Sequence, residues 1–321
     1  MAMNDLPQPL QPDGEVIAAQ ATFKARGLVN GDVLRQPLAE ARSATYAYQA
    51  FLNEGGPDTE VVEHHLPTTP PTPVRIYRPQ GSAGPLPVYL HIHGGGFAIG
   101  NLNTLDRWKR EVAADAGVAV VGMEYALSPE HPYPTALNQV MAVLHWLRKD
   151  AAALDLDMQR FAIGGDSAGG NLALAALLRL RDGHQPLPRL GAIVYGMLST
   201  NHATPSHRDL GDGRFGLSTE KLDWFWTQYL GGEATLRVHP EATPLTARLE
   251  GLPPLLLLAA ALDPLLDDTL NLDRRLEETG IPHETRIYPG MPHGFLGQTA
   301  LLEKARQAQA DLVAALRRSL A

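Results

Sequence analysis

One serine in this sequence has neighbours that would make it a nucleophile. Ser167 stands between Gly165 and Gly169, so the segment satisfies the pattern Gly-x-Ser-x-Gly. An apolar, strand-like run precedes it, and a helix-forming run begins at Asn171. A sharp turn from strand to helix presents a serine hydroxyl, and the residues two positions away must be small to avoid a clash. We therefore predict that Ser167 attacks an acyl carbonyl.

The same glycines offer an alternative, a loop that binds the phosphates of a nucleotide. The pattern Gly-x-Gly-x-x-Gly cannot be threaded through them, and Asn171 stands where a P-loop needs lysine. The spacing therefore favours the nucleophile. The helix that follows would place partial positive charge near the developing negative charge.

A second glycine-rich segment could stabilise that negative charge. Residues 93–97 read His-Gly-Gly-Gly-Phe and directly follow the apolar run 88–92. Glycines allow backbone N–H groups to approach a tetrahedral oxyanion, and the residue after the nucleophile, Ala168, supplies another N–H group. Two separate motifs thus predict one oxyanion hole.

His91 and His93 could instead form a metal pair, because alternate residues of a strand point to the same face. No nearby acidic residue or histidine completes a recognisable ligand set. We therefore interpret His93 as a residue that braces the loop by bonding to backbone, and His91 as ordinary packing. The predicted chemistry requires neither a metal nor an organic cofactor.

The base of such a site comes last in the chain, after an acid, and each member lies beyond the carboxyl end of a strand. Only two histidines come late enough. His283 precedes the strand expected at 284–288, which places it at the wrong edge of the sheet, whereas His293 follows that strand. We predict that His293 is the base.

Asp263 is the predicted acid because it ends the apolar run 255–262 and precedes a proline that breaks the strand. Asp267 and Asp268 are its rivals. Their position suits capping of the next helix, a structural role that needs no catalysis. With Asp263 as the acid, the carboxylate orients the imidazole of His293 and stabilises its cation, and an acyl-enzyme forms on the serine.

The elements that must position these residues alternate between short β-rich runs and helical runs. This alternation predicts an α/β fold in which helices flank a mostly parallel sheet of eight strands. The first two strands are joined by a short proline-rich turn, so we expect them to be antiparallel. The expected strands are 61–66, 74–77, 88–92, 118–123, 160–164, 192–195, 255–260 and 284–288. The expected helices between later strands are 105–116, 135–149, 171–181 and 269–278.

Two segments lie outside this core, which we divide into residues 56–198 and 233–321. Residues 1–55 are expected to form an N-terminal helical segment, and residues 199–232 an insertion with a helix near 218–226. We predict that both contribute to a cap over the active site.

Three residues of the insertion are candidates for the substrate pocket. They are Phe215, Leu217 and Trp224. Trp224 begins a run of three aromatic residues on the expected helix, and consecutive helical residues point in different directions. At least one of these aromatic residues is therefore expected to pack in the core of the cap.

Composition excludes several other classes of protein. Lys and Arg total 27 against 35 for Asp and Glu, and the net charge of −8 would repel nucleic acid. The absence of cysteine excludes disulfides and a thiol nucleophile. No apolar run approaches the ~20 residues of a membrane-spanning helix, and the first residues lack the features of a signal peptide. We expect a cytoplasmic protein without stable membrane association.

Taken together, the motifs resemble those of the hormone-sensitive-lipase-like carboxylesterases, bacterial family IV, which include the acetyl esterases and belong to the α/β-hydrolase superfamily. The resemblance runs from about residue 88 to residue 295. It rests on His-Gly-Gly-Gly-Phe at 93–97, Tyr-Ala-Leu-Ser-Pro-Glu-His-Pro-Tyr-Pro at 125–134, Gly-Asp-Ser-Ala-Gly at 165–169, Asp-Pro-Leu at 263–265 and His-Gly-Phe at 293–295.

The resemblance implies an α/β-hydrolase fold, an oxyanion hole from Gly95, Gly96 and Ala168, and short- to medium-chain acyl esters as small-molecule substrates. One departure is Ala126, where many relatives have arginine. An amidase or formamidase with the same triad, and a non-catalytic ligand-binding protein of this fold, are the alternatives. By analogy, the exposed end of the sheet could pair two subunits in a homodimer.

Overall fold

A single sheet of eight strands forms the centre of the molecule. The computed structural model describes residues 10–321, so the first nine residues of the expected N-terminal segment lie outside it. The strand order is β1-β2-β4-β3-β5-β6-β7-β8, and β2 is antiparallel to both of its neighbours while the other pairs are parallel. The strands are β1 (Thr59–Leu66), β2 (Thr72–Pro79), β3 (Leu86–Ile92), β4 (Ala119–Met123), β5 (Leu156–Asp166), β6 (Leu190–Val194), β7 (Leu255–Leu262) and β8 (His283–Pro292).

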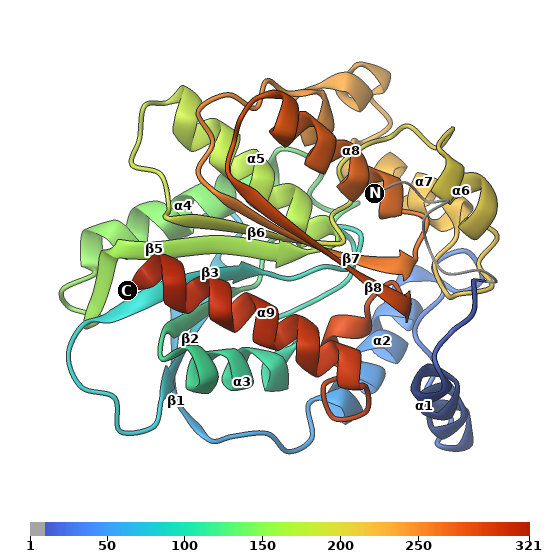
Figure 1. Cartoon of the computed structure of the whole chain (residues 1–321), viewed down its shortest axis with the longest axis horizontal. Coiled ribbons are helices and arrows are strands. Elements are labelled where there is room, and N and C mark those ends of the chain that lie inside the picture. Colours follow the sequence, from blue (N-terminus) through green and yellow to red (C-terminus); the bar gives the residue numbers. More distant parts are fainter. Residues whose placement is uncertain (1–9) are drawn as a thin grey trace.

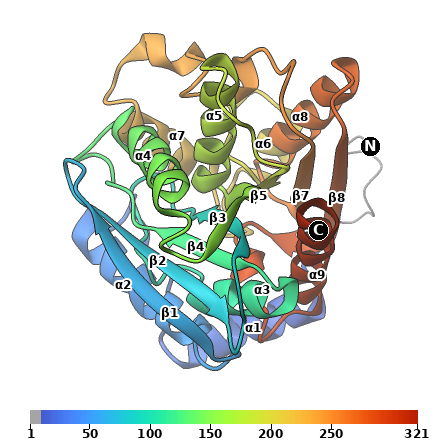
Figure 2. The same ribbon diagram turned by 90° about the vertical axis from the view of Figure 1, so that its left-hand side faces the viewer.

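Helices cover both faces of this sheet (Figure 1, Figure 2). One face carries α4 (Thr135–Asp150), α5 (Ala168–Asp182) and α8 (Leu266–Glu278). The other carries α3 (Asp106–Ala116) and α9 (Glu303–Leu320). Strands β3, β4, β6 and β7 are buried along their whole length, as expected for parallel strands covered on both faces. Each therefore reads as an almost continuous apolar run.

The predicted core is confirmed in its elements and in the antiparallel start of the sheet. Residues Thr59 to Leu66 pair in register with Pro79 to Thr72. The helix α9 was not among the predicted elements, although its buried residues recur at turn-like spacings from Ala305 to Leu320. It packs beneath the sheet and completes the second helical layer (Figure 1).

The segments outside the core are helical. The N-terminal segment contains α1 (Gly14–Ala25) and α2 (Leu38–Leu52), and the insertion contains α6 (Pro205–Leu210) and α7 (Thr219–Tyr229). The hydroxyl of Ser218 caps α7 by accepting a hydrogen bond from the N–H of Lys221. Short 3-10 turns occur at Ala234–Val238, Pro244–Thr246 and Phe295–Gly297. Within residues 10–321, no helix has both the length and the apolar character needed to cross a membrane.

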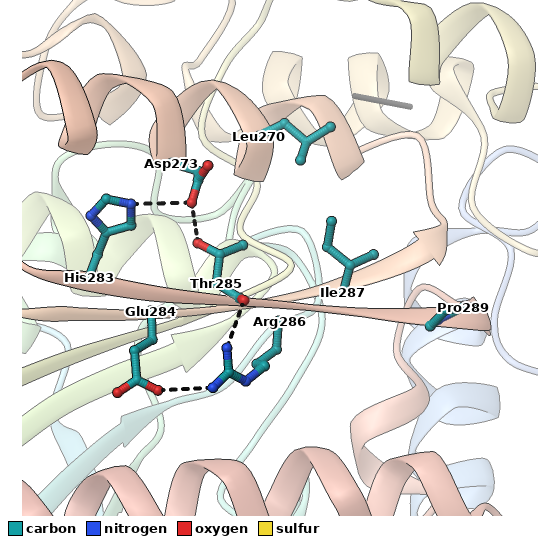
Figure 3. Close-up of a pocket in the computed structure, with 8 residues that line it drawn as sticks. All are labelled: Leu270, Asp273, His283, Glu284, Thr285, Arg286, Ile287 and Pro289. Atoms are coloured by element: carbon teal, nitrogen blue, oxygen red, sulfur yellow. Dashed lines mark hydrogen bonds and ion pairs between the residues drawn. The ribbon is translucent and has the colours of Figure 1, made fainter. Parts of the chain in front are cut away.

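Strand β8 forms one edge of the sheet and borders a groove of about 520 Å³ beside α8 (Figure 3). Figure 3 shows His283 and Thr285 pointing toward α8, while Glu284 and Arg286 point to the opposite face. The hydroxyl of Thr285 donates to Asp273 of α8, and His283 Nε2 lies 3.3 Å from the same carboxylate. Pairing of two subunits at an exposed end of the sheet stays a prediction.

Candidate functional site

The turn between β5 and α5 holds Ser167 in an unusual backbone conformation. Its φ of 55° and ψ of −119° are rare for a residue with a side chain. The N–H of Ser167 donates to the carbonyl of Val194 at 2.9 Å, and its carbonyl accepts from the N–H of Met197 at 3.1 Å. A conformation of this kind persists only where the surrounding structure holds it. These two bonds tie the turn to the end of β6.

The two glycines of the motif allow that turn to pack tightly. A Cβ atom on Gly165 would lie 2.4 Å from the backbone carbonyl of Gly169, and one on Gly169 would lie 2.0 Å from the carbonyl oxygen of Ile92. Backbone atoms cannot yield as a flexible side chain can. The spacing Gly-x-Ser-x-Gly is therefore a requirement of the backbone geometry between β3, β5 and α5.

The three side chains predicted to form a triad lie in one chain of contacts. His293 Nε2 is 2.9 Å from Ser167 Oγ, and His293 Nδ1 is 2.6 Å from Asp263 Oδ2. Asp263 is fully buried, and its other oxygen accepts from the N–H of Leu265 at 2.9 Å. An ionised carboxylate only accepts, so Nδ1 carries the hydrogen and Nε2 is left to accept from the serine hydroxyl. This is the protonation state that a general base requires.

Asp267 and Asp268, the alternatives to Asp263 as the acid, do not have the structural role that was expected. No side chain caps α8. Asp268 instead accepts hydrogen bonds from the N–H groups of Leu198 and Ser199, at 2.8 and 3.0 Å, and Asp267 accepts from the N–H of Ser206 at 2.8 Å. Burial raises the pKa of Asp268 to about 8. The expectation of helix capping is wrong because these side chains point back to the insertion and fasten its first residues to α8.

The glycine-rich loop after β3 presents backbone amides to the same place. Gly95 and Gly96 line a cavity together with Ser167 and His293. Their N–H groups donate no hydrogen bond to any residue in the range 10–321. Ala168 is the first residue of α5, where a helical N–H has no partner within the helix. Three amides near the nucleophile thus have unused hydrogen-bonding capacity.

Three side chains form hydrogen bonds with the backbone of this loop. The N–H of Gly94 donates to Asp166 Oδ1 at 3.0 Å, and the hydroxyl of Tyr125 donates to the carbonyl of His93 at 3.0 Å. His93 Nδ1 lies 2.8 Å from the carbonyl of Gly94, as expected of a residue that bonds to backbone. Burial lowers the pKa of His93 to about 4. Sequence reasoning missed Asp166, although it directly precedes the nucleophile.

The two histidines of the alternative metal pair have different neighbours. The rings of His91 and His93 belong to different contacts, since His91 packs at 4.7 Å on Trp108 and His93 stacks at 4.3 Å on Tyr125. Within the described part of the chain, no group of three or more histidine or acidic side chains is placed to hold a metal ion.

A cavity of about 490 Å³ opens above Ser167, between the core and the two outer segments. Leu217 lines it, as predicted, but Phe215 and Trp224 do not. Phe215 packs instead with its ring 4.7 Å from the guanidinium of Arg214, beside a small cluster around α6 and α8. Only part of the insertion therefore contributes to the cavity wall, together with residues of the N-terminal segment and the core.

Phe225 occupies the position that was predicted for Trp224. A Cβ atom on Gly96 would lie 2.2 Å from the ring of Phe225, so this side chain packs directly against residues 93–97, which we name the oxyanion loop after their predicted role. Leu222, three residues earlier on α7, lines the cavity beside it. Each helical residue is turned by about 100° from the last. Trp224 accordingly faces away, and Trp226 is fully buried against Phe97.

Two further features of the cavity were not anticipated from sequence. The ring of Tyr195, directly after β6, lies 4.7 Å from the ring of His293, and burial raises the pKa of Tyr195. Lys221 of α7 lies 3.5 Å from Asp32 of the N-terminal segment. This ion pair joins the two outer segments at the cavity wall, because both of its residues line the cavity. In the sequence, the position of Tyr195 at the end of an expected strand was the one feature that could have indicated its place in the site.

The sheet is mostly parallel, a serine lies on a strand-to-helix turn, and a histidine and an aspartate lie on loops after later strands. These features together define an α/β hydrolase. A family model described as alpha/beta hydrolase fold matches residues 89–297, and the chain belongs to this family.

Known relatives agree with the resemblance stated from the motifs. The chain is 34% identical over 252 residues to an ethyl acetate hydrolase from Pseudomonas putida, covering 77% of this chain and 79% of that protein. It is 36% identical over 249 residues to an acetyl esterase from Salmonella schwarzengrund, covering 75% and 76%. A hyperthermophilic esterase from the archaeon Pyrobaculum calidifontis has a similar structure, with a TM-score of 0.90, 26% identity and coverage of 96% and 98%.

Proposed function

We propose that this protein is a serine carboxylesterase that hydrolyses short- to medium-chain acyl esters through an acyl-enzyme on Ser167. The observation that carries the proposal is the contact of His293 with both Ser167 and Asp263, at 2.9 and 2.6 Å, at the floor of a cavity. The esterase relatives and structural neighbours support the same reaction class.

In the first half of the reaction, Ser167 Oγ forms a bond to the ester carbonyl carbon while His293 Nε2 takes the hydroxyl proton. The carbonyl electron pair moves onto oxygen, which the amides of Gly95, Gly96 and Ala168 stabilise. Asp263 remains ionised and stabilises the imidazolium. The tetrahedral intermediate then collapses, the bond to the alcohol oxygen breaks, and His293 returns its proton to that oxygen.

In the second half, water replaces the alcohol. His293 removes a proton from water as the water oxygen attacks the acyl carbon, and the same three amides receive the second oxyanion. Collapse breaks the bond to Ser167 Oγ, which regains a proton from His293. The products are a carboxylic acid and the free enzyme, so every proton taken in one step is returned in the next.

The size and lining of the cavity support the proposed acyl preference. A volume of about 490 Å³, with Leu217, Leu222 and Phe225 on one wall, accommodates a short apolar chain. The relatives named ethyl acetate hydrolase and acetyl esterase act on short acyl groups by their names. Rates on p-nitrophenyl esters from acetate to palmitate test the proposal. We expect a maximum at short to medium chains, and a maximum at palmitate would contradict it.

The amidase alternative is tested with an ester and an amide of equal acyl length. We expect a higher kcat/KM for the ester. The cytoplasmic location and the homodimer stay predictions from the sequence. Cell fractionation and light scattering of the purified protein test them.

A further inference from the structure

One face of α2 carries a row of polar side chains. Arg42, Tyr46 and Gln49 are spaced by four and three residues, and Asn53 continues the row just beyond the end of the helix. Residues at this spacing lie on the same face of a helix. All four bond to the backbone of one segment, residues 98–107, which directly follows the oxyanion loop. The four side chains therefore contact the same backbone segment, which we call the target segment.

The contacts are spread along the target segment from Ala98 to Arg107. Arg42 Nε donates to the carbonyl of Ala98 at 2.8 Å, and the hydroxyl of Tyr46 donates to the carbonyl of Gly100 at 3.2 Å. Further along, the side-chain oxygen of Gln49 accepts from the N–H of Leu105 at 3.4 Å. Asn53 Nδ2 donates to the carbonyl of Asn103 at 2.7 Å, and Asn53 Oδ1 accepts from the N–H of Arg107 at 3.3 Å.

Arg42 is itself held in place. Its two terminal nitrogens lie 2.7 Å from the two carboxylate oxygens of Glu130, and one of them also donates to the carbonyl of Ser128 at 3.1 Å. A paired arrangement of this kind fixes the plane of the guanidinium. The Arg42 side chain is only 19% exposed, compared with 51% for Glu130. Glu130 therefore orients Arg42 but does not touch the oxyanion loop.

The backbone just before the Arg42 contact needs external support. Gly95, Gly96 and Phe97 have positive φ values of 113°, 59° and 61° in succession. The carbonyl of Gly95 accepts from the N–H groups of Ala98 and Ile99, so the position of Ala98 is linked to the orientation of the Gly95 peptide. The two glycines adopt such values without strain, but Phe97 has a side chain, and its conformation is maintained only by its surroundings. A bond to the carbonyl of Ala98 is thus close to the amides proposed to bind the oxyanion.

We infer that the polar face of α2 is a template for the oxyanion loop and that Arg42 is a positioning residue for the hydrolysis reaction. The inference rests on the proposed function. It assigns a determinant of rate to a helix that lies outside residues 89–297, the part matched by the family model. Arg42 acts through the loop and does not touch the reacting atoms.

The experiment compares Arg42→Ala and Arg42→Lys with Arg179→Ala in the full-length protein. Arg179 also pairs through two nitrogens with both carboxylate oxygens of a glutamate, Glu241, at 2.8 and 2.6 Å, and it donates to Asn138 at 2.7 Å. Among the described residues it makes no hydrogen bond to 93–107, and its side chain is 26% exposed. Its replacement removes an arginine that is bonded and buried to a similar degree. It therefore controls for loss of stability alone.

We expect Arg42→Ala to lower kcat by about tenfold to a hundredfold, less than the loss of an oxyanion donor itself, with little change in KM. Affinity for a trifluoromethyl ketone, which binds as an oxyanionic adduct of the serine, should fall by a similar factor. Arg42→Lys keeps the charge but not the fork of nitrogens, so it should lie between wild type and Arg42→Ala. Arg179→Ala should lower thermal stability and leave kcat within about twofold of wild type.

A second, milder variant keeps the test valid if Arg42→Ala does not fold. Tyr46→Phe removes only the hydroxyl that bonds to Gly100, and we expect a loss of kcat of about twofold to fivefold. Unchanged kcat and ketone affinity in Tyr46→Phe and in every folded Arg42 variant would overturn the inference. If wild type still reacts with a fluorophosphonate and hydrolyses esters, the proposed function stands in that case. A wild type that does neither removes the proposed function as well.

Discussion

The turn around Ser167 and the insertion at 199–232 differ in what determines the role of each residue. In the turn, nearby backbone determines which residue types fit, because a Cβ atom on Gly165 or Gly169 would collide with a carbonyl group. In the insertion, residue roles are determined by distant contacts, such as the bonds from Asp268 to Leu198 and Ser199. Constraints of the first kind are visible in a short stretch of sequence. Constraints of the second kind become visible only when the chain is folded.

Among the variants that test this comparison, the largest loss of kcat is expected at Asp263, the acid of the site. The loss should be much smaller at Asp267, which bonds to the insertion. Asp263→Asn leaves the side-chain shape but favours the wrong tautomer of His293, so we expect kcat to fall by about 10⁴. Asp267→Asn keeps an oxygen for the N–H of Ser206, and its kcat should fall by less than about tenfold. Steady-state kinetics on p-nitrophenyl butyrate measures both. Equal losses in the two variants would break the distinction.

A smaller effect should come from the oxyanion loop. An alanine at Gly96 would adopt a positive φ of 59° and would also meet the ring of Phe225 at 2.2 Å. We expect Gly96→Ala to lower kcat by about 10²–10³ because the amides are displaced. Gly117→Ala is the matched control, since its φ is 70° and its Cβ would meet nothing within 4 Å. It should lose about 1 kcal/mol of stability at unchanged kcat, and a comparable fall in its kcat would show that strain alone explains Gly96→Ala.

The insertion should affect specificity more than rate. Leu217 lines the cavity, so Leu217→Ala enlarges it and should raise the ratio of kcat/KM for octanoate over butyrate by about threefold to tenfold. Trp224 lies outside the cavity lining. Trp224→Ala should therefore leave that ratio unchanged while lowering the melting temperature. A shift of chain preference in Trp224→Ala instead would restore it as a pocket residue.

The smallest effect concerns stability and pH. Folding raises the pKa of Asp268 from 3.8 to about 8, so between these values the folded state holds a proton that the unfolded state releases. Wild type therefore loses stability as pH rises through this range. Asp268→Asn removes this cost and can still accept from Leu198 and Ser199. We expect its melting temperature to exceed that of wild type by a few degrees at pH 9 and by less at pH 5. A difference that does not depend on pH would contradict this account of Asp268.

The same division explains which parts were predictable. The order of strands and helices, and the positions of Ser167, Asp263 and His293, follow from apolar runs and from the turn residues that end them. Phe225 could not be distinguished from Trp224, because the choice depends on how α7 docks on the core, and neighbouring residues differ by about 100° in direction. Arg42 gave no local signal, since its partner Ala98 is 56 residues away along the chain.

The central claim is that Ser167 is the nucleophile, and covalent labelling tests it most directly. Wild-type protein and Ser167→Ala are treated with a fluorophosphonate, and the modified peptide is identified by mass spectrometry. The account predicts one adduct per chain, on Ser167, with loss of esterase activity. It also predicts that Ser167→Ala is unlabelled and has a kcat reduced by about 10⁵ or more. An adduct on another residue, or a folded Ser167→Ala that still hydrolyses esters at the wild-type rate, would contradict it.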